Sequence, residues 1–264
     1  MMGAIRKTWV VTAPDEVAPA IDPTVETLLS LQTAFPREAP VPIREPEPLG
    51  TANLKAFHLL REDAPEEYLG QFRQLRSRLI RRRELEFAKG RELRSLVVTS
   101  PEPGDGKTFV ALNLALMLAV AQGSRVLVGD LNVRRPAFHT RMLLPAAPGI
   151  RECLGDETWR ACARMVPHMG LYVAPLGEQR FSELDPVDYQ QVRRWLSAIR
   201  QDFDWIVLDA PAWRGAPDAE TLSHIADGTI VVLRKGQSSF QDCDELLAKL
   251  DRSRLVGAVL NGLR

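Results

Sequence analysis

Short, almost uninterrupted apolar runs recur along the last two thirds of the chain. They include Val126-Leu127-Val128, Ile206-Val207-Leu208 and Ile230-Val231-Val232-Leu233. A strand that is apolar at successive positions is buried on both faces, which is typical of parallel sheets covered by helices. The pattern predicts strands at 95–99, 125–129, 171–174, 205–209, 229–233 and 255–260.

Helical periodicity separates several of these runs and predicts helices at 107–122, 186–200 and 240–250. Asp185-Pro186 supplies a cap residue and a first-turn proline for the second helix. Ser239 with Asp242 forms a capping pair for the third. Strands that alternate with helices predict an α/β fold, a mostly parallel β-sheet flanked by helices. Ligands bind such sheets at the carboxyl ends of the strands.

The first 94 residues lack this alternation. Residues 1–50 hold eight of the 19 prolines and little periodicity, so we expect a mostly flexible N-terminal segment. Residues 51–94 are predicted to form a helical extension that contacts a partner or a neighbouring subunit. Residues 95–264 then form the α/β domain.

The extension contains a predicted helix over 65–88. Tyr68, Phe72, Leu75 and Leu79 share one face at helical spacing. The other face is basic and holds Arg73, Arg76, Arg78, Arg81, Arg82 and Arg83. This run is either a solvated helix face or a contact surface for a neighbouring subunit or acidic lipid. Charge alone favours the solvated face.

Overall charge and composition narrow the possible partners. Basic and acidic residues balance at 34 each, so charge gives no argument for nucleic acid as a partner. The three cysteines form no C-x-x-C pair, which fits a reduced cytosolic setting and disfavours a zinc site. No apolar stretch reaches the roughly 20 residues of a membrane-spanning helix. We therefore expect a cytoplasmic protein that reaches a membrane only through another protein.

The most informative stretch is Thr99-Ser100-Pro101-Glu102-Pro103-Gly104-Asp105-Gly106-Lys107-Thr108, between a predicted strand and a predicted helix. In a phosphate-binding P-loop, small residues let the N–H groups of such a loop turn inward, and the positive end of the helix faces the same point. Lys107 would contact the β- and γ-phosphates, and Thr108 would ligate Mg²⁺. Pro101 replaces the first glycine of the usual pattern, and the alternative is a glycine-rich surface turn. The predicted nucleotide-binding residues are Pro103, Gly104, Asp105, Gly106, Lys107, Thr108 and Phe109.

Two later strands end in carboxylates. Asp130 follows Val126-Leu127-Val128-Gly129, and Asp209 follows Ile206-Val207-Leu208. A carboxylate at the end of a buried strand is costly to desolvate without a cation or hydrogen-bond donors. Beside a P-loop the natural cation is Mg²⁺ with its waters. The alternative is a carboxylate that caps a helix start or pairs with an arginine.

These motifs resemble those of the bacterial tyrosine kinases, the cytoplasmic P-loop kinases of capsule and exopolysaccharide export. The family's first motif, S-x-x-P-G-E-G-K-[ST], is matched by Ser100 to Thr108. Its second, D-x-D-x-R-x-P, is matched by Asp130, Asn132, Arg134 and Pro136, and its third by Leu208-Asp209-Ala210-Pro211. The resemblance covers about residues 65–264 and implies the P-loop NTPase architecture shared with the Min/Par ATPases.

The resemblance also implies roles for single residues, with ATP and Mg²⁺ as cofactors. Lys107, Asp130 and Asp209 would be catalytic, and Thr108, Asp130 and Asp209 would hold the metal. Asn261 matches an asparagine that contacts adenine in related P-loop proteins. The implied partner is an inner-membrane regulator of polysaccharide chain length, at the inner face of the cell membrane, and a homo-oligomer is possible.

The chain departs from the family at three points. Asn132 replaces the second aspartate of the second motif, which should weaken Mg²⁺ ordering. Gly70 replaces the glutamate of the family's oligomerisation helix motif, E-x-x-R-x-x-R. The Tyr-rich tail of the family is missing, and the tyrosines Tyr68, Tyr172 and Tyr189 are not clustered.

Three functions therefore stay open. The first is a protein-tyrosine kinase of exopolysaccharide assembly that phosphorylates a partner. The second is a catalytically weak or inactive nucleotide-dependent switch that controls assembly of the export complex. The third is a Min/Par-type partitioning ATPase, which is disfavoured because Glu102 stands where that group has a lysine that reaches across a dimer.

Overall fold

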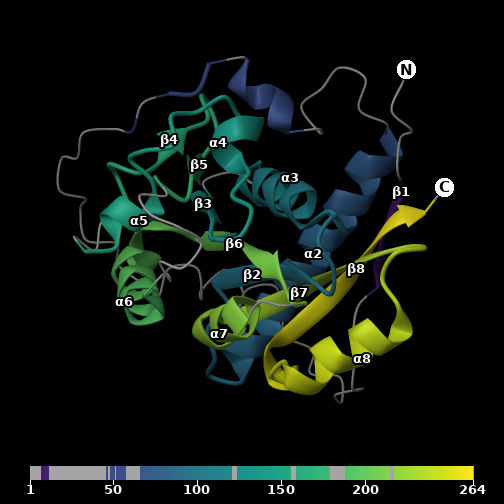
Figure 1. Ribbon diagram of the computed structural model, residues 1–264. Coiled ribbons are helices and arrows are strands. Elements are labelled where there is room, and N and C mark those ends of the chain that lie inside the picture. The colour runs from purple at the N-terminus through teal and green to yellow at the C-terminus, as the bar shows by residue number, and fades with distance from the viewer. Residues whose placement is uncertain are drawn as a thin grey trace, which may run out of the picture.

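The structure is a computed structural model that describes residues 7–11, 46, 48–50, 52–57, 66–120, 124–155, 159–178, 188–214 and 217–263. Most of the segment 1–50 and the predicted helix start at Asp185-Pro186 lie outside these residues. Figure 1 shows a single twisted sheet through the middle of the molecule, with helices on both faces.

The sheet has eight strands in the order β1-β8-β7-β2-β6-β3-β5-β4. The strands are β1 (Lys7–Val11), β2 (Ser95–Ser100), β3 (Val126–Asp130), β4 (Arg164–Met165), β5 (Leu171–Ala174), β6 (Trp205–Ala212), β7 (Gly228–Arg234) and β8 (Leu255–Leu263). The six from β8 to β5 are parallel, and they are the six strands predicted from the apolar runs. The edge strands β1 and β4 are antiparallel to their neighbours and were not predicted.

Side chains of the central strands alternate between two apolar layers. Leu96 and Val98 face one layer, whereas Val97 faces the other. The first layer is covered by α2 (Glu66–Ala88), α3 (Lys107–Ala119) and α4 (Phe138–Arg141). The second is covered by α5 (Ile150–Cys153), α6 (Tyr189–Ile199), α7 (Pro217–Ile225) and α8 (Phe240–Lys249). Short 3₁₀ turns are η1 (Asn53–Ala56), η3 (Arg200–Asp202) and η4 (Arg252–Arg254).

Two predicted helices are described over shorter ranges, and their predicted bounds at residues 186 and 122 lie outside the described residues. α6 begins at Tyr189, because Asp188 is the N-cap and accepts a hydrogen bond from the N–H of Gln190 at 2.9 Å. α3 ends at Ala119, with Val120 as its C-cap. The capping pair at α8 is confirmed, because the Ser239 hydroxyl accepts from the N–H of Asp242 at 3.1 Å. The nine-residue helix α7 was not predicted.

The helix predicted over 65–88 is confirmed as α2, and its apolar face packs against α3. Phe72 is 1% exposed, and its ring lies 6.0 Å from that of Phe109 in an edge-to-face arrangement. Part of the basic face also packs on the protein, because the Arg83 guanidinium lies 4.9 Å from the Trp205 ring. Among the described residues, no helix combines the length and the apolar character needed to cross a bilayer.

The contact between α2 and α3 predicts the effect of a truncation. Phe72→Ala removes a buried ring between the two helices, so we expect the free energy of unfolding to fall by about 3–5 kcal/mol. Gln74→Ala, at an exposed position of the same helix, is the control and should change it little. Urea denaturation measures both variants. If Phe72→Ala lowers the free energy of unfolding as little as the control does, α2 does not pack on the domain in this way.

Candidate nucleotide-binding site

The loop between β2 and α3 has the backbone shape of an anion-binding nest. Gly104 and Gly106 have φ of 90° and 104°, in the left-handed region that favours glycine. At Gly106 a side chain is also excluded by space, because a Cβ there would lie 2.2 Å from Nδ2 of Asn261. The two glycines of the predicted motif are therefore required by the conformation of the loop.

Three side chains from the ends of β7 and β8 hold the outer side of this loop. Nη1 of Arg234 donates to the carbonyl oxygen of Gly104 at 2.9 Å, and Nε2 of Gln237 donates to that of Pro103 at 2.7 Å. Nδ2 of Asn261 donates to the carbonyl oxygen of Asp105 at 2.8 Å. Because these carbonyls point toward β7 and β8, the N–H groups of the loop are left for an anion on its inner side.

A buried ammonium and a helix end face the same point. α3 begins at Lys107, and its N-cap Gly106 provides no side-chain acceptor for the first N–H groups. Lys107 is 6% exposed, and its Nζ donates to Oγ of Ser100 at 3.1 Å. Burial lowers the pKa of Lys107, whereas the nearby carboxyls of Asp209 and Asp105 act in the opposite direction. A phosphate bound here would supply the strong acceptor that this buried cation lacks.

The predicted metal ligands Thr108 and Asp209 lie together. Oγ1 of Thr108 donates to Oδ2 of Asp209 at 2.6 Å, which joins the start of α3 to β6. Asp209 is fully buried, and its Oδ1 has no hydrogen-bond partner among the described residues. An unsatisfied buried oxygen next to a threonine hydroxyl fits a Mg²⁺ ion or one of its waters.

Asp130 lies beside Asp209 but makes different contacts. The two residues are register partners across β3 and β6. Oδ1 of Asp130 accepts from the N–H of Asn132 at 3.0 Å. Its Oδ2 accepts from the N–H groups of Ala137 and Phe138 at 2.7 and 3.0 Å, at the start of α4. Asp130 thus holds the loop that follows β3 and caps the start of α4, as in the alternative interpretation of this carboxylate. Its metal-binding and catalytic roles stay predictions.

Burial perturbs both carboxyls. It raises the pKa of Asp130 to about 6, although three backbone N–H groups and His139 oppose the rise. It raises the pKa of Asp209 to about 7, and the neighbouring Asp130 adds to that rise, whereas Thr108 and Lys107 oppose it. Both carboxyls therefore keep their protons up to a higher pH than an ordinary aspartate does.

The other residues singled out in the sequence differ in their exposure and contacts. Pro103 is exposed at the tip of the loop. The Phe109 ring packs against Tyr68 at 6.4 Å as well as Phe72, so this residue can offer the nucleotide only its backbone. Asn132 is 8% exposed, and its Oδ1 accepts from the N–H of Arg135 at 3.2 Å.

Sequence reasoning missed three residues that shape the loop: Ser100, Arg234 and Gln237. Ser100 is the first residue of the motif S-x-x-P-G-E-G-K-[ST], so the motif could have identified it. Arg234 and Gln237 lie 130 and 134 residues from the carbonyls they hold, and nothing in the local pattern points to them.

A magnesium ion fits this site only if phosphate oxygens of a bound nucleotide complete its coordination. The described residues hold no group of three His, Cys, Asp or Glu side chains suited to a metal. The predicted set has two carboxyls and one hydroxyl. Since Mg²⁺ usually keeps several waters and binds one or two carboxylates together with phosphate oxygens, this set is sufficient beside a nucleotide.

Comparison with known proteins agrees with the motifs. No protein-family model matches the chain. It is 28% identical over 195 residues to the tyrosine-protein kinase YwqD of Bacillus subtilis, covering 69% of this chain and 78% of YwqD. It is 30% identical over 179 residues to the succinoglycan biosynthesis transport protein ExoP of Rhizobium meliloti, covering 65% of this chain but 22% of ExoP. The chain is related to the bacterial tyrosine kinases.

Solved structures agree with this relationship. The kinase domain of VpsO superposes with a TM-score of 0.61 at 26% identity, covering 75% of this chain and 98% of that domain. MinD of Pyrococcus horikoshii, solved with Mg-ADP, shares the fold, with a TM-score of 0.51 at 20% identity over 63% of this chain and 69% of MinD. The predicted α/β P-loop architecture is confirmed, and so is the resemblance to the bacterial tyrosine kinases.

The raised pKa values predict how stability depends on pH. Folded Asp130 and Asp209 have pKa values of about 6 and about 7, against 3.8 for an ordinary aspartate. The folded state therefore binds more protons than the unfolded chain between about pH 4 and pH 7, and the free energy of unfolding falls as pH rises through that window.

Asp209→Asn removes the group with the higher pKa. We expect this variant to lose stability less steeply with pH and to exceed the wild type at neutral pH by on the order of 1–2 kcal/mol. Urea denaturation of the nucleotide-free protein at several pH values measures this, with the exposed Glu84→Gln as control. Identical pH profiles for Asp209→Asn and wild type would contradict the burial argument.

Proposed function

We propose that this chain binds ATP and Mg²⁺ and transfers phosphate to tyrosine on a partner protein of exopolysaccharide or capsule export. The observation that carries the proposal is the pair Thr108–Asp209, joined at 2.6 Å, with Oδ1 of Asp209 buried and unsatisfied next to the P-loop. The names of two relatives, a tyrosine-protein kinase and a succinoglycan transport protein, support the reaction and the process.

Each residue of the site has a task in this proposal. Bound Mg-ATP would supply the phosphoryl group and the divalent counter-charge. The loop N–H groups of 103–108 and the Lys107 ammonium hold the phosphates, and Thr108 and Asp209 hold the metal. Asp130 keeps the loop after β3 in place beside them. Catalysis then rests on positioning and charge neutralisation.

The acceptor is proposed to lie on another protein. Tyr172 is 6% exposed, and the Tyr189 hydroxyl donates to Oδ1 of Asp218 at 2.6 Å. Neither tyrosine can accept phosphate on its hydroxyl without a local rearrangement. An inner-membrane regulator of polysaccharide chain length would be the partner, which would hold this chain at the inner face of the membrane. The helix α2 would serve contacts with that partner or with further copies.

A nucleotide-dependent switch without strong kinase activity is the second candidate. It is favoured by the state of the second motif, where Asn132 brings no charge and both Asp130 oxygens are occupied by backbone N–H groups. A carboxylate held in this way is a poor base for the attacking hydroxyl. Nucleotide binding would then control assembly of the export complex.

Lys107→Ala tests whether the P-loop binds the nucleotide. Loss of a charge-assisted contact of about 1.5–3 kcal/mol should weaken ATP affinity by about 10–100-fold. Isothermal titration with Mg-ATP measures the affinity, and Lys89→Ala, at an exposed lysine in the turn after α2, is the matched control. Equal affinities for the two variants would rule out the P-loop as the nucleotide site.

Asn132→Asp separates the two candidate functions. The substitution restores the family's second aspartate and should strengthen Mg²⁺ ordering, so we expect at least about tenfold more phosphotyrosine on the partner if the site is otherwise intact. Radiolabelled ATP with the membrane partner measures the transfer. Labelling by the wild type supports the kinase; labelling only by the variant supports the switch. If neither labels tyrosine while ATP still binds, the kinase proposal fails.

A further inference from the structure

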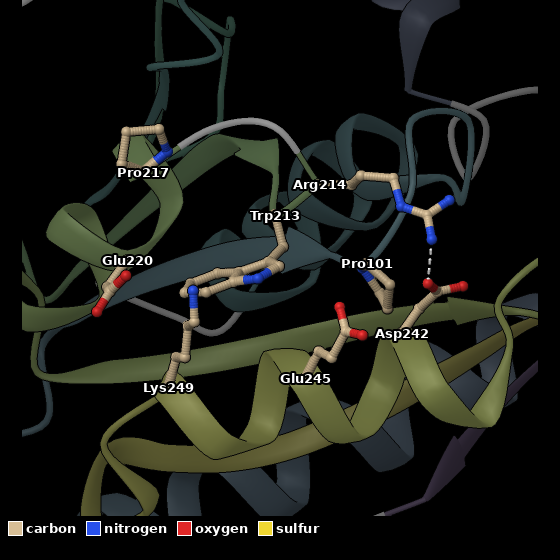
Figure 2. Close-up of a pocket in the computed structure, with 8 residues that line it drawn as sticks. All are labelled: Pro101, Trp213, Arg214, Pro217, Glu220, Asp242, Glu245 and Lys249. Atoms are coloured by element: carbon tan, nitrogen blue, oxygen red, sulfur yellow. Dashed lines mark hydrogen bonds and ion pairs between the residues drawn. The ribbon is translucent and has the colours of Figure 1, made fainter.

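A cleft of about 470 Å³ opens beside the P-loop, between the end of β6, the start of α7 and one side of α8. Figure 2 shows the Trp213 indole at its centre, with Lys249 and Glu245 pointing up from α8 and Glu220 pointing down from α7. The volume lies within the range of about 300–1,000 Å³ of pockets that bind small ligands. The lining residues are Pro101, Trp213, Arg214, Pro217, Glu220, Asp242, Glu245 and Lys249.

One wall of this cleft is the P-loop itself. The N–H of Trp213 donates to the carbonyl oxygen of Ser100 at 2.8 Å, and that of Arg214 donates to Pro101 at 3.1 Å. Trp213 also follows Asp209 by only four residues along the chain. A chain segment in the cleft would therefore lie against Pro101, at the start of the P-loop.

Both cations of the cleft already have partners. Arg214 forms an ion pair with Glu102 of the P-loop at 2.6 Å and a second one with Asp242 of α8. Nζ of Lys249 lies 5.4 Å from the centre of the Trp213 ring. Glu220 and Glu245 have no ion-pair partner within the part of the chain that the structure describes, although Oε1 of Glu245 accepts a hydrogen bond from Nε2 of Gln241 at 3.0 Å. The lining therefore carries an excess of negative charge, with three carboxylates against two cations, and it favours additional positive charge.

We propose that this cleft docks the acceptor polypeptide, as an extended segment in which basic residues flank the tyrosine. This proposal rests on the proposed kinase function and names the class of its substrate. Lysine or arginine side chains of the segment replace Lys249 on the Trp213 face and pair with Glu220 and Glu245. A phosphate-rich ligand such as nucleic acid would meet these carboxylates unfavourably.

Peptide binding by the full chain tests the proposal without any need for catalysis. The probes are short fluorescent peptides with a central tyrosine flanked by lysine and arginine, by neutral residues or by glutamate. We expect the basic peptide to bind about tenfold or more tightly than the others, and added salt to weaken it. The variant is Glu220→Gln with Glu245→Gln, and it should lower the affinity of the basic peptide about tenfold.

The control removes the same charge elsewhere. Asp244→Asn with Glu84→Gln neutralises two exposed carboxylates that do not line the cleft, one of them on α8. Affinity close to that of the wild type is expected. Equal binding of all three peptides, no peptide binding, or equal losses in the cleft and control variants would each overturn the docking proposal.

The failure of the two proposals can be told apart. ATP affinity and tyrosine labelling are measured on the same proteins, and ATP affinity should be unchanged in both charge variants. Selective binding of the basic peptide without ATP binding would leave the cleft intact and refute the kinase. If the chain binds ATP and transfers phosphate to the partner but shows no preference for basic peptides, the kinase proposal stands and the docking proposal is refuted.

Discussion

The burial of four charged side chains at one edge of the sheet is the constraint on which the site depends. Asp105, Asp130 and Asp209 are fully buried and Lys107 nearly so, which sets three carboxyls against one ammonium. Effective desolvation costs several kcal/mol per buried ion. Without a ligand, proton uptake by Asp130 and Asp209 relieves this imbalance, and their raised pKa values express it. If the site binds a divalent cation as proposed, the cation would provide the same relief, and its binding would release protons from these carboxyls.

Asn132 has a physical meaning in this setting. It is 8% exposed beside Asp130, and its amide oxygen accepts from the N–H of Arg135. An aspartate here could accept the same hydrogen bond but would add a fourth carboxyl to the cluster. The amide therefore keeps the loop geometry while lowering the electrostatic cost of the nucleotide-free protein. Under the proposed function, the amide would also order Mg²⁺ less strongly than an aspartate.

The parts of this structure that follow from local pattern could be predicted from the sequence. The six parallel strands, the glycine-containing loop and the side chains of Lys107, Thr108 and Asp209 all belong to short motifs at strand ends. What failed depends on distant partners. β1 pairs with β8 from the other end of the chain, and Arg234 and Gln237 reach the loop across more than a hundred residues. The role of Asp130 was ambiguous for the same reason, because its donors come from the start of α4, which carries no strong helix signal.

Glu102 connects the nucleotide loop to the surface beside it. In the Min/Par pattern a lysine at this position reaches across a dimer. Here the Glu102 side chain is 16% exposed and pairs with Arg214, which also pairs with Asp242 of α8. A lysine at 102 would place two cations against each other and leave Asp242 as the only acceptor for both. The chain therefore uses this position for an internal contact between the P-loop, the end of β6 and α8.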